Sequence, residues 1–257
     1  MKAVRQAVID IGSNTVRLVV YAGLPRAPLP IYNEKSRVKL GACLAGDGII
    51  DKATMKKALA ALARFETLAK AMQADTMRVV ATAATREAKN GHELVEKAAA
   101  LGIHVDVLDG DAEATAAGLG ILSDNPHANG YVGDLGGGSL ELIRISDGKL
   151  GTRISLPLGT LRHDILTGKS AKQVVAMLRD DIAKTMGKRA FPIETGLPFY
   201  MIGGSWRSFA RLHMHETGYP LTILSNYEMP PEAPDVLAPL TQDKDALTRS
   251  NVVAAGR

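Results

Sequence analysis

Two short motifs in this chain combine a carboxylate, glycines and hydroxyl or amide side chains in an order suited to phosphate chemistry. The first is Asp10-Ile-Gly-Ser-Asn14, and the second, Asp134-Leu-Gly-Gly-Gly-Ser139, begins 124 positions later. Glycine lets backbone N–H groups approach phosphate oxygens, and a concave array of such groups binds anions. The aspartates stand where carboxylates could hold Mg²⁺ beside the phosphates, directly or through its waters. The pair therefore predicts a site for a phosphate–metal complex.

Alone, each motif is a weak signal, because Asp-Gly turns between strands are mostly ordinary hairpins. The pair is stronger, since duplicated domains place equivalent hairpins opposite one another across a cleft. The sequence contains neither G-x-x-x-x-G-K-[ST], which excludes a P-loop, nor the G-x-G-x-x-G of a Rossmann dinucleotide site. The candidate phosphate-binding residues of the two motifs are Gly12, Ser13, Asn14, Gly136, Gly137, Gly138 and Ser139.

Composition narrows the class of partner. The 257 residues carry a net charge of +4 and a pI of about 9.1, which favours anionic partners. Aromatic residues make up only 4%, and no basic stretch is interleaved with them, which argues against nucleic acid. No apolar run is long enough to span a membrane, and the first ten residues do not resemble a secretory signal. A single cysteine, Cys43, excludes an internal disulfide, so we expect a cytoplasmic protein.

The elements that must position these motifs follow from apolar spacing. The first half begins with a hairpin, and Asp51 then caps a helix with one apolar stripe. Strands and helices alternate after it, which indicates a mixed α/β sheet. The expected strands are residues 4–10, 15–22, 36–40, 77–81 and 103–108. The expected helices are the one after Asp51, residues 85–101 and residues 111–122.

The pattern restarts in the second half. Strands are expected at residues 131–134, 140–145, 149–156 and 199–202, and helices at residues 171–184 and 206–213. We interpret this as an internal duplication with an N-terminal domain at residues 1–124 and a C-terminal domain at residues 125–257. Beyond residue 220 the pattern weakens and residues 229–240 are expected to be mostly irregular, so the second domain looks incomplete at its end.

Four blocks, in this order and spacing, resemble the exopolyphosphatase/guanosine pentaphosphatase family. They are residues 7–20 (AVIDIGSNTVRLVV), 79–90 (VVATAATREAKN), 107–121 (VLDGDAEATAAGLGI) and 134–143 (DLGGGSLELI). The resemblance runs from residue 7 to residue 204 and reappears at residues 249–256. That family belongs to the actin-like, sugar-kinase and heat-shock ATPase superfamily. The resemblance thus implies two duplicated actin-like (ribonuclease-H-like) α/β domains, each with a mixed sheet, and an interdomain cleft.

The resemblance also assigns roles. Glu113 falls on the family's catalytic base, which would orient and deprotonate water attacking a phosphoryl group. Arg86 matches a phosphate-binding arginine, whose planar fork can bind phosphate oxygens bidentately. Glu141 matches a glutamate just past the second loop and joins Asp10 and Asp134 as a candidate metal ligand. The loop placed where relatives bind a base or a distal phosphate is Gly203, Gly204 and Ser205.

The implied function is metal-dependent hydrolysis of the terminal phosphoanhydride of inorganic polyphosphate, with Mg²⁺ and, as an alternative, Mn²⁺. Removal of the 5′ γ-phosphate of guanosine pentaphosphate (pppGpp) stays open, because both reactions share the residues that bind the transferring phosphate. A sugar kinase would need an adenosine pocket, an acceptor site and usually a longer chain. A non-catalytic sensor is a remoter alternative, because Ala112 and Thr115 replace a glutamate and an arginine of the family pattern.

Chain length leads to one more expectation. Longer family members carry a helical C-terminal region that extends the basic path for the polymer, and 257 residues leave no room for it. We therefore expect an enzyme that releases its polymer often, although the homodimer that we also expect could join two clefts into one track. Candidate basic residues at the rim are Arg153, Arg162, Lys169 and Lys172.

Overall fold

The computed structural model describes residues 4–24, 27–162, 171–188 and 190–242. The chain divides into two compact units, residues 1–200 and residues 201–257. The first unit contains both glycine motifs and the elements around them. The boundary that we predicted between residues 124 and 125 remains a prediction.

The first sheet has five strands in the order β3-β2-β1-β4-β5. β1, β2 and β3 form an antiparallel meander, while β4 runs parallel to β1 and β5 parallel to β4. The arrangement agrees with the mixed α/β sheet predicted from the sequence. The strands are β1 (Arg5–Ile11), β2 (Thr15–Leu24), β3 (Ala27–Arg37), β4 (Thr76–Ala81) and β5 (Asp106–Val107).

Two strand predictions in this sheet were wrong in extent. The third strand, expected at residues 36–40, is β3, which ends at Arg37 and begins ten residues earlier. The sequence prediction placed a loop before residue 36. β3 tolerates Pro28 and Pro30 because it is an edge strand, where a missing N–H can face solvent without loss. The strand expected at residues 103–108 pairs only over β5, near its C-terminal end.

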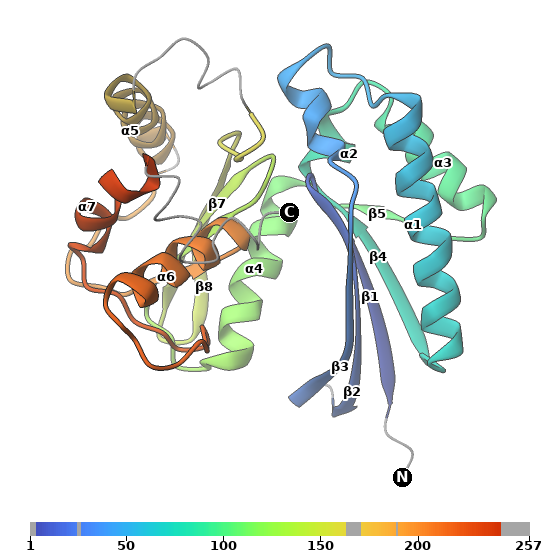
Figure 1. Cartoon of the computed structure of the whole chain (residues 1–257), viewed down its shortest axis with the longest axis horizontal. Helices are drawn as coiled ribbons and strands as arrows, with labels where there is room; N and C mark the ends of the chain where they lie inside the picture. Colours follow the sequence, from blue (N-terminus) through green and yellow to red (C-terminus); the bar gives the residue numbers. More distant parts are fainter. Residues whose placement is uncertain (1–3, 25–26, 163–170, 189, 243–257) are drawn as a thin grey trace. The chain divides into compact units, whose positions relative to one another are not determined.

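α1 (Lys52–Ala71) and α3 (Gly91–Ala100) pack beside the first sheet (Figure 1). As predicted, Asp51 caps α1, and its carboxylate accepts hydrogen bonds of 2.9 Å from the amides of Ala53 and Thr54. The apolar stripe of α1 enters the core, where Leu62 and Phe65 are fully buried. Burial of such side chains contributes about 1.5–3 kcal/mol each.

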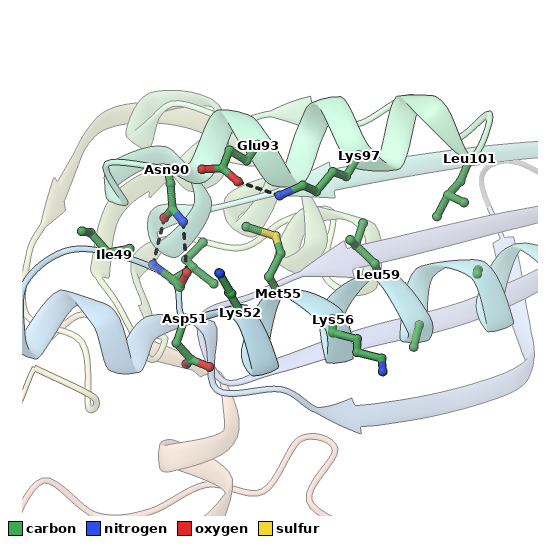
Figure 2. A pocket seen from close by; sticks show the side chains of 13 residues that line it. Ile49, Asp51, Lys52, Met55, Lys56, Leu59, Asn90, Glu93, Lys97 and Leu101 are labelled. Carbon is green, nitrogen blue, oxygen red and sulfur yellow. Dashed lines mark hydrogen bonds and ion pairs between the residues drawn. The ribbon is translucent and has the colours of Figure 1, made fainter.

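The helix expected at residues 85–101 is instead two helices, α2 (Ala83–Glu87) and α3. Asn90, between them, bonds both the N–H and the C=O of Ile50 through its side chain (Figure 2). A Cβ on Gly91 would lie 1.9 Å from the carbonyl oxygen of Thr85, so the chain can fold back this closely only at glycine. Because the chain turns between α2 and α3, Arg86 lies in a helix of only five residues.

A groove of about 770 Å³ lies between α1 and α3 (Figure 2). Met55, Leu59 and Leu101 line its apolar part, and Lys52 and Lys56 lie along its edge. None of the candidate phosphate-binding, catalytic or metal-binding residues lines it. The groove is therefore separate from the site predicted from the sequence.

The second sheet repeats the plan of the first. Its strand order is β8-β7-β6-β9. β6, β7 and β8 form a second antiparallel meander, and β9, which comes later in the chain, lies beside β6. α4 (Gly110–Asp124) packs against β6, β7 and β8. The strands are β6 (Gly130–Leu135), β7 (Leu140–Ser146), β8 (Lys149–Leu156) and β9 (Phe199–Ile202), and α5 (Ala171–Lys188) follows β8 along the chain. The repeated topology supports the predicted duplication.

The second unit contains α6 (Gly204–Glu216), α7 (Ala233–Leu237) and a 3-10 helix (Pro239–Gln242). Residues 229–240, which were expected to be mostly irregular, contain α7 and the start of the 3-10 helix and are otherwise irregular. The Nδ1 atom of buried His213 lies 2.6 Å from the hydroxyl of Tyr227, which anchors the loop after α6. Within the described residues, no helix is long and apolar enough to cross a membrane.

Candidate phosphate-binding site

The two glycine motifs have the same local geometry. The N–H of Gly12 donates to the carbonyl of Thr15, and the N–H of Gly136 donates to that of Ser139, both at 3.0 Å. In each motif the aspartate is the penultimate residue of the strand before the loop, β1 or β6. The 124-residue repeat seen in the sequence is therefore also a repeat of backbone structure.

The segment after β3 supports the first loop from behind. The amide of Gly41 donates to the carbonyl of Ser13 at 2.7 Å, and the amides of Val38 and Lys39 donate to that of Asn14 at 3.1 and 2.9 Å. Across a trans peptide the C=O of one residue points opposite to the N–H of the next. Because these carbonyls face the supporting segment, the amide that follows each of them faces the other way.

The segment after β8 supports the second loop in the same manner. The amide of Thr160 donates to the carbonyl of Gly136 at 3.1 Å, and the amide of Leu161 donates to that of Gly137 at 2.8 Å. A Cβ on Gly159 would lie 2.2 Å from the Gly137 oxygen, so this close approach requires glycine. The second loop therefore also turns its amides away from its support.

Amides of the two loops that lack an acceptor are the feature that suits the anion predicted from the sequence. Successive N–H groups without internal partners create a concave positive surface that suits phosphate oxygens. Within the described part of the chain, no acceptor bonds the amides of Ser13, Asn14, Gly137, Gly138 and Ser139. The structure thus provides donors at five of the seven residues that the sequence marked as phosphate-binding.

The two loops pack directly against each other. Ser13 is buried, and a Cβ on Gly138 would lie only 2.6 Å from its hydroxyl oxygen and 2.9 Å from the Cβ of Ala83. A Cβ on Gly41 would lie 2.7 Å from the Cβ of Ser13. Glycine is therefore required at these positions for close packing, in addition to any approach of a ligand.

Four carboxylates influence one another beside the loops. Burial, followed by the charge of Asp134, raises the pKa of Asp10 to about 6. Burial and then the charge of Glu113 raise the pKa of Glu141 to about 7. The pKa of Glu113 is also raised, mainly by burial, although its bond to Arg86 opposes the shift. Buried carboxylates that repel one another favour binding of a cation.

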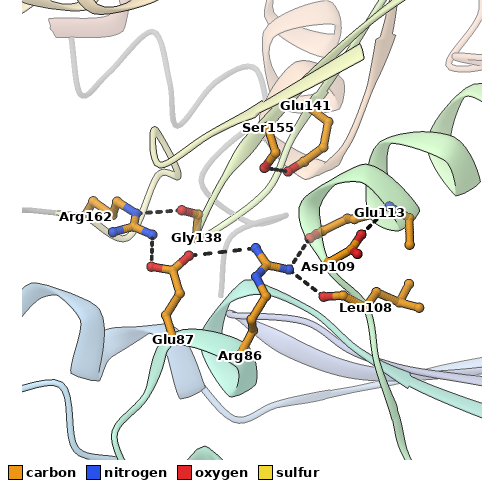
Figure 3. Close-up of polar contacts among 10 residues, drawn as sticks. Arg86, Glu87, Leu108, Asp109, Glu113, Gly138, Glu141, Ser155 and Arg162 are labelled. Carbon is orange, nitrogen blue, oxygen red and sulfur yellow. Dashed lines mark hydrogen bonds and ion pairs between the residues drawn. The ribbon is translucent and has the colours of Figure 1, made fainter. Parts of the chain in front are cut away.

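Arg86 and Glu113, to which the resemblance assigned separate roles, are in contact (Figure 3). The Nη1 of Arg86 donates to Glu113 Oε2 at 3.2 Å and to the carbonyl of Leu108 at 2.7 Å. Its Nη2 lies 3.8 Å from Glu87 Oε1. α2 contributes Arg86, and the first turn of α4 contributes Glu113, so two separate elements bring the predicted clamp and the predicted base together.

Asp10, Asp134 and Glu141, the metal ligands expected from the sequence, offer only carboxylate oxygens, which suit Mg²⁺. In the part of the chain that the structure describes, no three His, Cys, Asp or Glu side chains converge to hold a metal ion by themselves. Mg²⁺ usually takes one or two carboxylates and completes its shell with water and phosphate oxygens. The all-oxygen donor set and the raised pKa values of Asp10 and Glu141 agree with such a site.

Sequence reasoning missed Ser155 and Glu87. Ser155 is the cross-strand partner of Glu141, and its hydroxyl donates to Glu141 Oε1 at 2.8 Å (Figure 3). The β7–β8 register pairs the two residues, and no spacing in the sequence reveals that register. Glu87 follows Arg86 directly, and this adjacency was the one available signal.

Two buried polar atoms near these residues have no hydrogen-bond partner within the described residues, Asn14 Oδ1 and Thr85 Oγ1. A buried polar group left unsatisfied costs about 1–3 kcal/mol. Asn14 belongs to the first loop, and Thr85 immediately precedes Arg86. A bound water can donate to Asn14 Oδ1, which as an acceptor cannot bond phosphate oxygens directly, and the Thr85 hydroxyl can donate to such a water.

The predicted distal loop lies in the second unit. Gly203 has a left-handed φ of 113° and is the N-cap of α6, which begins at Gly204 and includes Ser205. The turn therefore opens a helix, and its contact with substrate remains a prediction. The late family motif at residues 249–256 lies outside the described residues.

Of the rim candidates, Arg153 and Arg162 both pair with acidic residues. Arg153 Nη2 lies 2.7 Å from Asp111 Oδ2, and Arg162 Nη2 lies 2.6 Å from Glu87 Oε2. Lys169 and the side chain of Lys172 lie outside the described residues. The two arginines therefore act within the protein, and their predicted contact with a polymer remains untested.

Comparisons with known proteins support this description. The chain is 30% identical over 220 residues to exopolyphosphatase 1 of Mycobacterium leprae (strain TN), which covers 81% of the chain and 64% of that protein. It is 31% identical over 189 residues to guanosine-5′-triphosphate,3′-diphosphate pyrophosphatase of Pseudoalteromonas atlantica, covering 70% of the chain and 37% of that protein. The chain thus spans less than two thirds of the length of either relative.

A solved structure supports the fold. The crystal structure of an exopolyphosphatase from Cytophaga hutchinsonii aligns with 98% of this chain and 87% of its own, at a TM-score of 0.80 and 21% identity. The prediction of two mixed α/β sheets in the actin-like arrangement is confirmed.

The sequence pattern of the Ppx/GppA phosphatase family matches residues 19–237. The duplicated loops and the Arg86–Glu113 pair lie largely within this match. The chain therefore belongs to the Ppx/GppA phosphatase family.

Proposed function

We propose that this protein hydrolyses the terminal phosphoanhydride of inorganic polyphosphate and releases orthophosphate. Five loop amides without an acceptor among the described residues, beside four mutually repelling carboxylates, support a site for a phosphate chain with its cation. The observation that carries the proposal is the contact of Arg86 with Glu113, because it joins a phosphate-binding group to a proton acceptor. Relatives named for polyphosphate and for guanosine pentaphosphate agree with this class of reaction.

In this proposal Glu113 accepts the proton of the attacking water. Burial raises the pKa of its carboxyl, which makes the carboxylate a stronger base near neutral pH. The 3.2 Å bond from Arg86 orients Glu113, while the other guanidinium donors face the transferring phosphoryl oxygens. Asp10, Asp134 and Glu141 would hold Mg²⁺, which neutralises charge on the phosphates when bound.

The amides of the two loops hold the rest of the phosphate chain in this scheme. Backbone donors already oriented toward the anion require no rearrangement when charge develops on the phosphoryl oxygens. Hydrolysis of pppGpp to ppGpp is the second candidate, and the named relative from Pseudoalteromonas atlantica favours it. Both substrates present the same terminal phosphoanhydride to the same groups.

The decisive experiment measures orthophosphate release from polyphosphate, pppGpp and ATP side by side in Mg²⁺, with Glu113→Gln as the inactive reference. Release from polyphosphate in excess of the other two supports the proposal, and preference for pppGpp replaces it with the second candidate. Binding of polyphosphate without release would instead identify a sensor. Equal background release by wild type and Glu113→Gln would refute hydrolysis at this site.

A further inference from the structure

The second loop is held by three successive donors from one short segment. The backbone amides of Thr160 and Leu161 bond the carbonyls of Gly136 and Gly137. The third carbonyl, that of Gly138, instead receives a side chain: the Nε of Arg162 donates to it at 2.6 Å (Figure 3).

The first loop shows what this third donor replaces. Gly138 corresponds to Asn14 by the 124-residue repeat, and the Asn14 carbonyl receives the backbone amides of Val38 and Lys39. Both donors come from the backbone just before the 3-10 helix at Leu40–Ala45. In the second half of the chain, the guanidinium of Arg162 supplies the donor that the backbone supplies in the first half.

The same guanidinium reaches the helix that carries the clamp arginine. Arg162 Nη2 lies 2.6 Å from Glu87 Oε2, and Glu87 Oε1 lies 3.8 Å from Arg86 Nη2. The Arg162 side chain is only 13% exposed, so solvent screens these contacts weakly. One connected set of polar contacts therefore runs from the Gly138 carbonyl to Glu113 (Figure 3).

We infer that Arg162 is a positioning residue, which fixes the second phosphate-binding loop relative to α2 and its Arg86. Holding the Gly138 carbonyl keeps the N–H of Ser139 aimed at the phosphate. Holding Glu87 fixes the end of the helix from which Arg86 reaches Glu113. This inference rests on the proposed function, because it assigns the loop and Arg86 to one anion.

A role for Arg162 as a rim cation that binds the polymer directly makes a different prediction. A residue that neutralises one phosphate of the polymer changes the slope of affinity against salt, by analogy with nucleic-acid binding. A positioning residue leaves that slope unchanged and affects short and long substrates equally. Because two of its nitrogens already bond the protein, Arg162 is poorly placed to bind the polymer.

The test compares Arg162→Ala, Arg162→Lys and Glu87→Gln, with Arg64→Ala as the matched control. Arg64 also makes a two-bond contact with a carboxylate, that of Glu34, but on the surface and away from the loops. The measurements are kcat and KM on short and long polyphosphate at two salt concentrations, the Kd for orthophosphate, and the melting temperature.

We expect Arg162→Ala to lower kcat/KM about 100-fold on both chain lengths, because misplacement of a reacting group by about 1 Å costs this much. The Kd for orthophosphate should rise in parallel, while Arg64→Ala stays within twofold of wild type. Arg162→Lys should recover part of the loss, since one ammonium cannot reach both Gly138 and Glu87 with the fork geometry. In the double variant Arg162→Ala/Glu87→Gln, kcat/KM should fall by less than the product of the two single-variant fold losses, because both residues act through the same contact.

A kcat/KM within threefold of wild type for folded Arg162→Ala overturns the inference. A loss confined to long chains, with a smaller salt slope, overturns it in favour of a rim cation. If Arg162→Ala does not fold, the Lys and Gln variants decide by the same criteria. If wild-type protein hydrolyses neither polyphosphate nor pppGpp, the proposed function fails, and the change in orthophosphate affinity alone tests the positioning role.

Discussion

At the residue scale, the site depends on a pair of groups with opposed tendencies. Burial raises the pKa of Glu113, while its bond to Arg86 opposes part of this shift. A base needs both a pKa close to the working pH and a defined orientation. Arg86 supplies the orientation through a contact made before any substrate arrives.

Glu113→Gln tests the proposed base with almost no change of shape. Glutamine can still accept the hydrogen bond from Arg86, but it cannot accept a proton. Loss of a positioned general base lowers rate about 10²- to 10⁴-fold, so kcat should fall by this amount. KM and the melting temperature should change little. Near-wild-type kcat in steady-state phosphate release would show that Glu113 is not the base.

Substitution of Arg86 separates charge from geometry. Arg86→Ala removes the bonds to Glu113 and to the carbonyl of Leu108, and leaves a half-buried carboxylate without this cation. We expect kcat/KM to fall by about 10²-fold or more, with Arg86→Lys intermediate because it keeps the charge but loses the planar fork. Equal kinetics for Arg86→Lys and wild type would mean that only the charge matters.

At the element scale, supporting segments and close glycine packing hold the loops in place. Both loops receive donors from the segment that follows the third strand of their own meander, so the supports are duplicated along with the loops. Side chains are kept out where the loops meet. This arrangement predicts that a single methyl group has opposite effects inside and outside the contact.

Gly138→Ala places a Cβ 2.6 Å from the hydroxyl of Ser13, which forces the two loops apart. Overpacking of this kind costs about 1–3 kcal/mol, and we expect weaker orthophosphate binding together with a lower melting temperature. Gly120→Ala is the control, because its Cβ on α4 would meet nothing within 4 Å and alanine favours helix by about 1 kcal/mol. Calorimetric titration and thermal melts measure both effects. Unchanged phosphate affinity in Gly138→Ala would contradict the packing argument.

At the scale of the whole molecule, the buried carboxylates couple stability to pH and to the cation. Folding raises the pKa of Asp10 from 3.8 to about 6 and that of Glu141 from 4.5 to about 7. A carboxyl with a raised pKa in the folded state binds its proton more tightly there. Its stabilising contribution is present below the unfolded pKa and is lost as pH rises through the folded value.

In EDTA, the melting temperature should therefore be lower at pH 8 than at pH 5. Above pH 5 the folded values of Asp10 and Glu141 cover about three pKa units, or roughly 4 kcal/mol, and we expect a fall of about 10 °C. Glu141→Gln should flatten this dependence, because it removes the group with the larger shift. The same pH dependence in Glu141→Gln and wild type would contradict the assignment.

Addition of Mg²⁺ should raise the melting temperature at pH 8 and have little effect at pH 5, where protonated carboxyls no longer attract the ion. Mn²⁺ should act like Mg²⁺, since the donors are hard oxygens, and Zn²⁺ should not restore activity. Chelation should abolish phosphate release. Full activity after exhaustive chelation would exclude a catalytic role for the ion.

The sequence by itself determined the duplicated strand–loop–strand units, the apolar stripe of α1 with its Asp51 cap, and the mixed α/β class. These features depend on local properties, namely the spacing of apolar residues, the positions of glycine and side-chain capping. Each of these is set by residues close together in the sequence. The four family blocks pointed to Arg86 and Glu113 together. The structure shows the two in contact and leaves their catalytic roles to experiment.

The tertiary structure alone decided the relations that cross elements. The prolines of β3 are tolerated because this strand lies at the sheet edge, and the break before α3 exists because Gly91 packs against the carbonyl of Thr85. Ser155 meets Glu141 through strand register, and Arg162 reaches Gly138 and Glu87 across 24 and 75 positions. Contacts at such separations leave no period in the sequence, because they depend on how elements pack and not on the spacing of residues within one element.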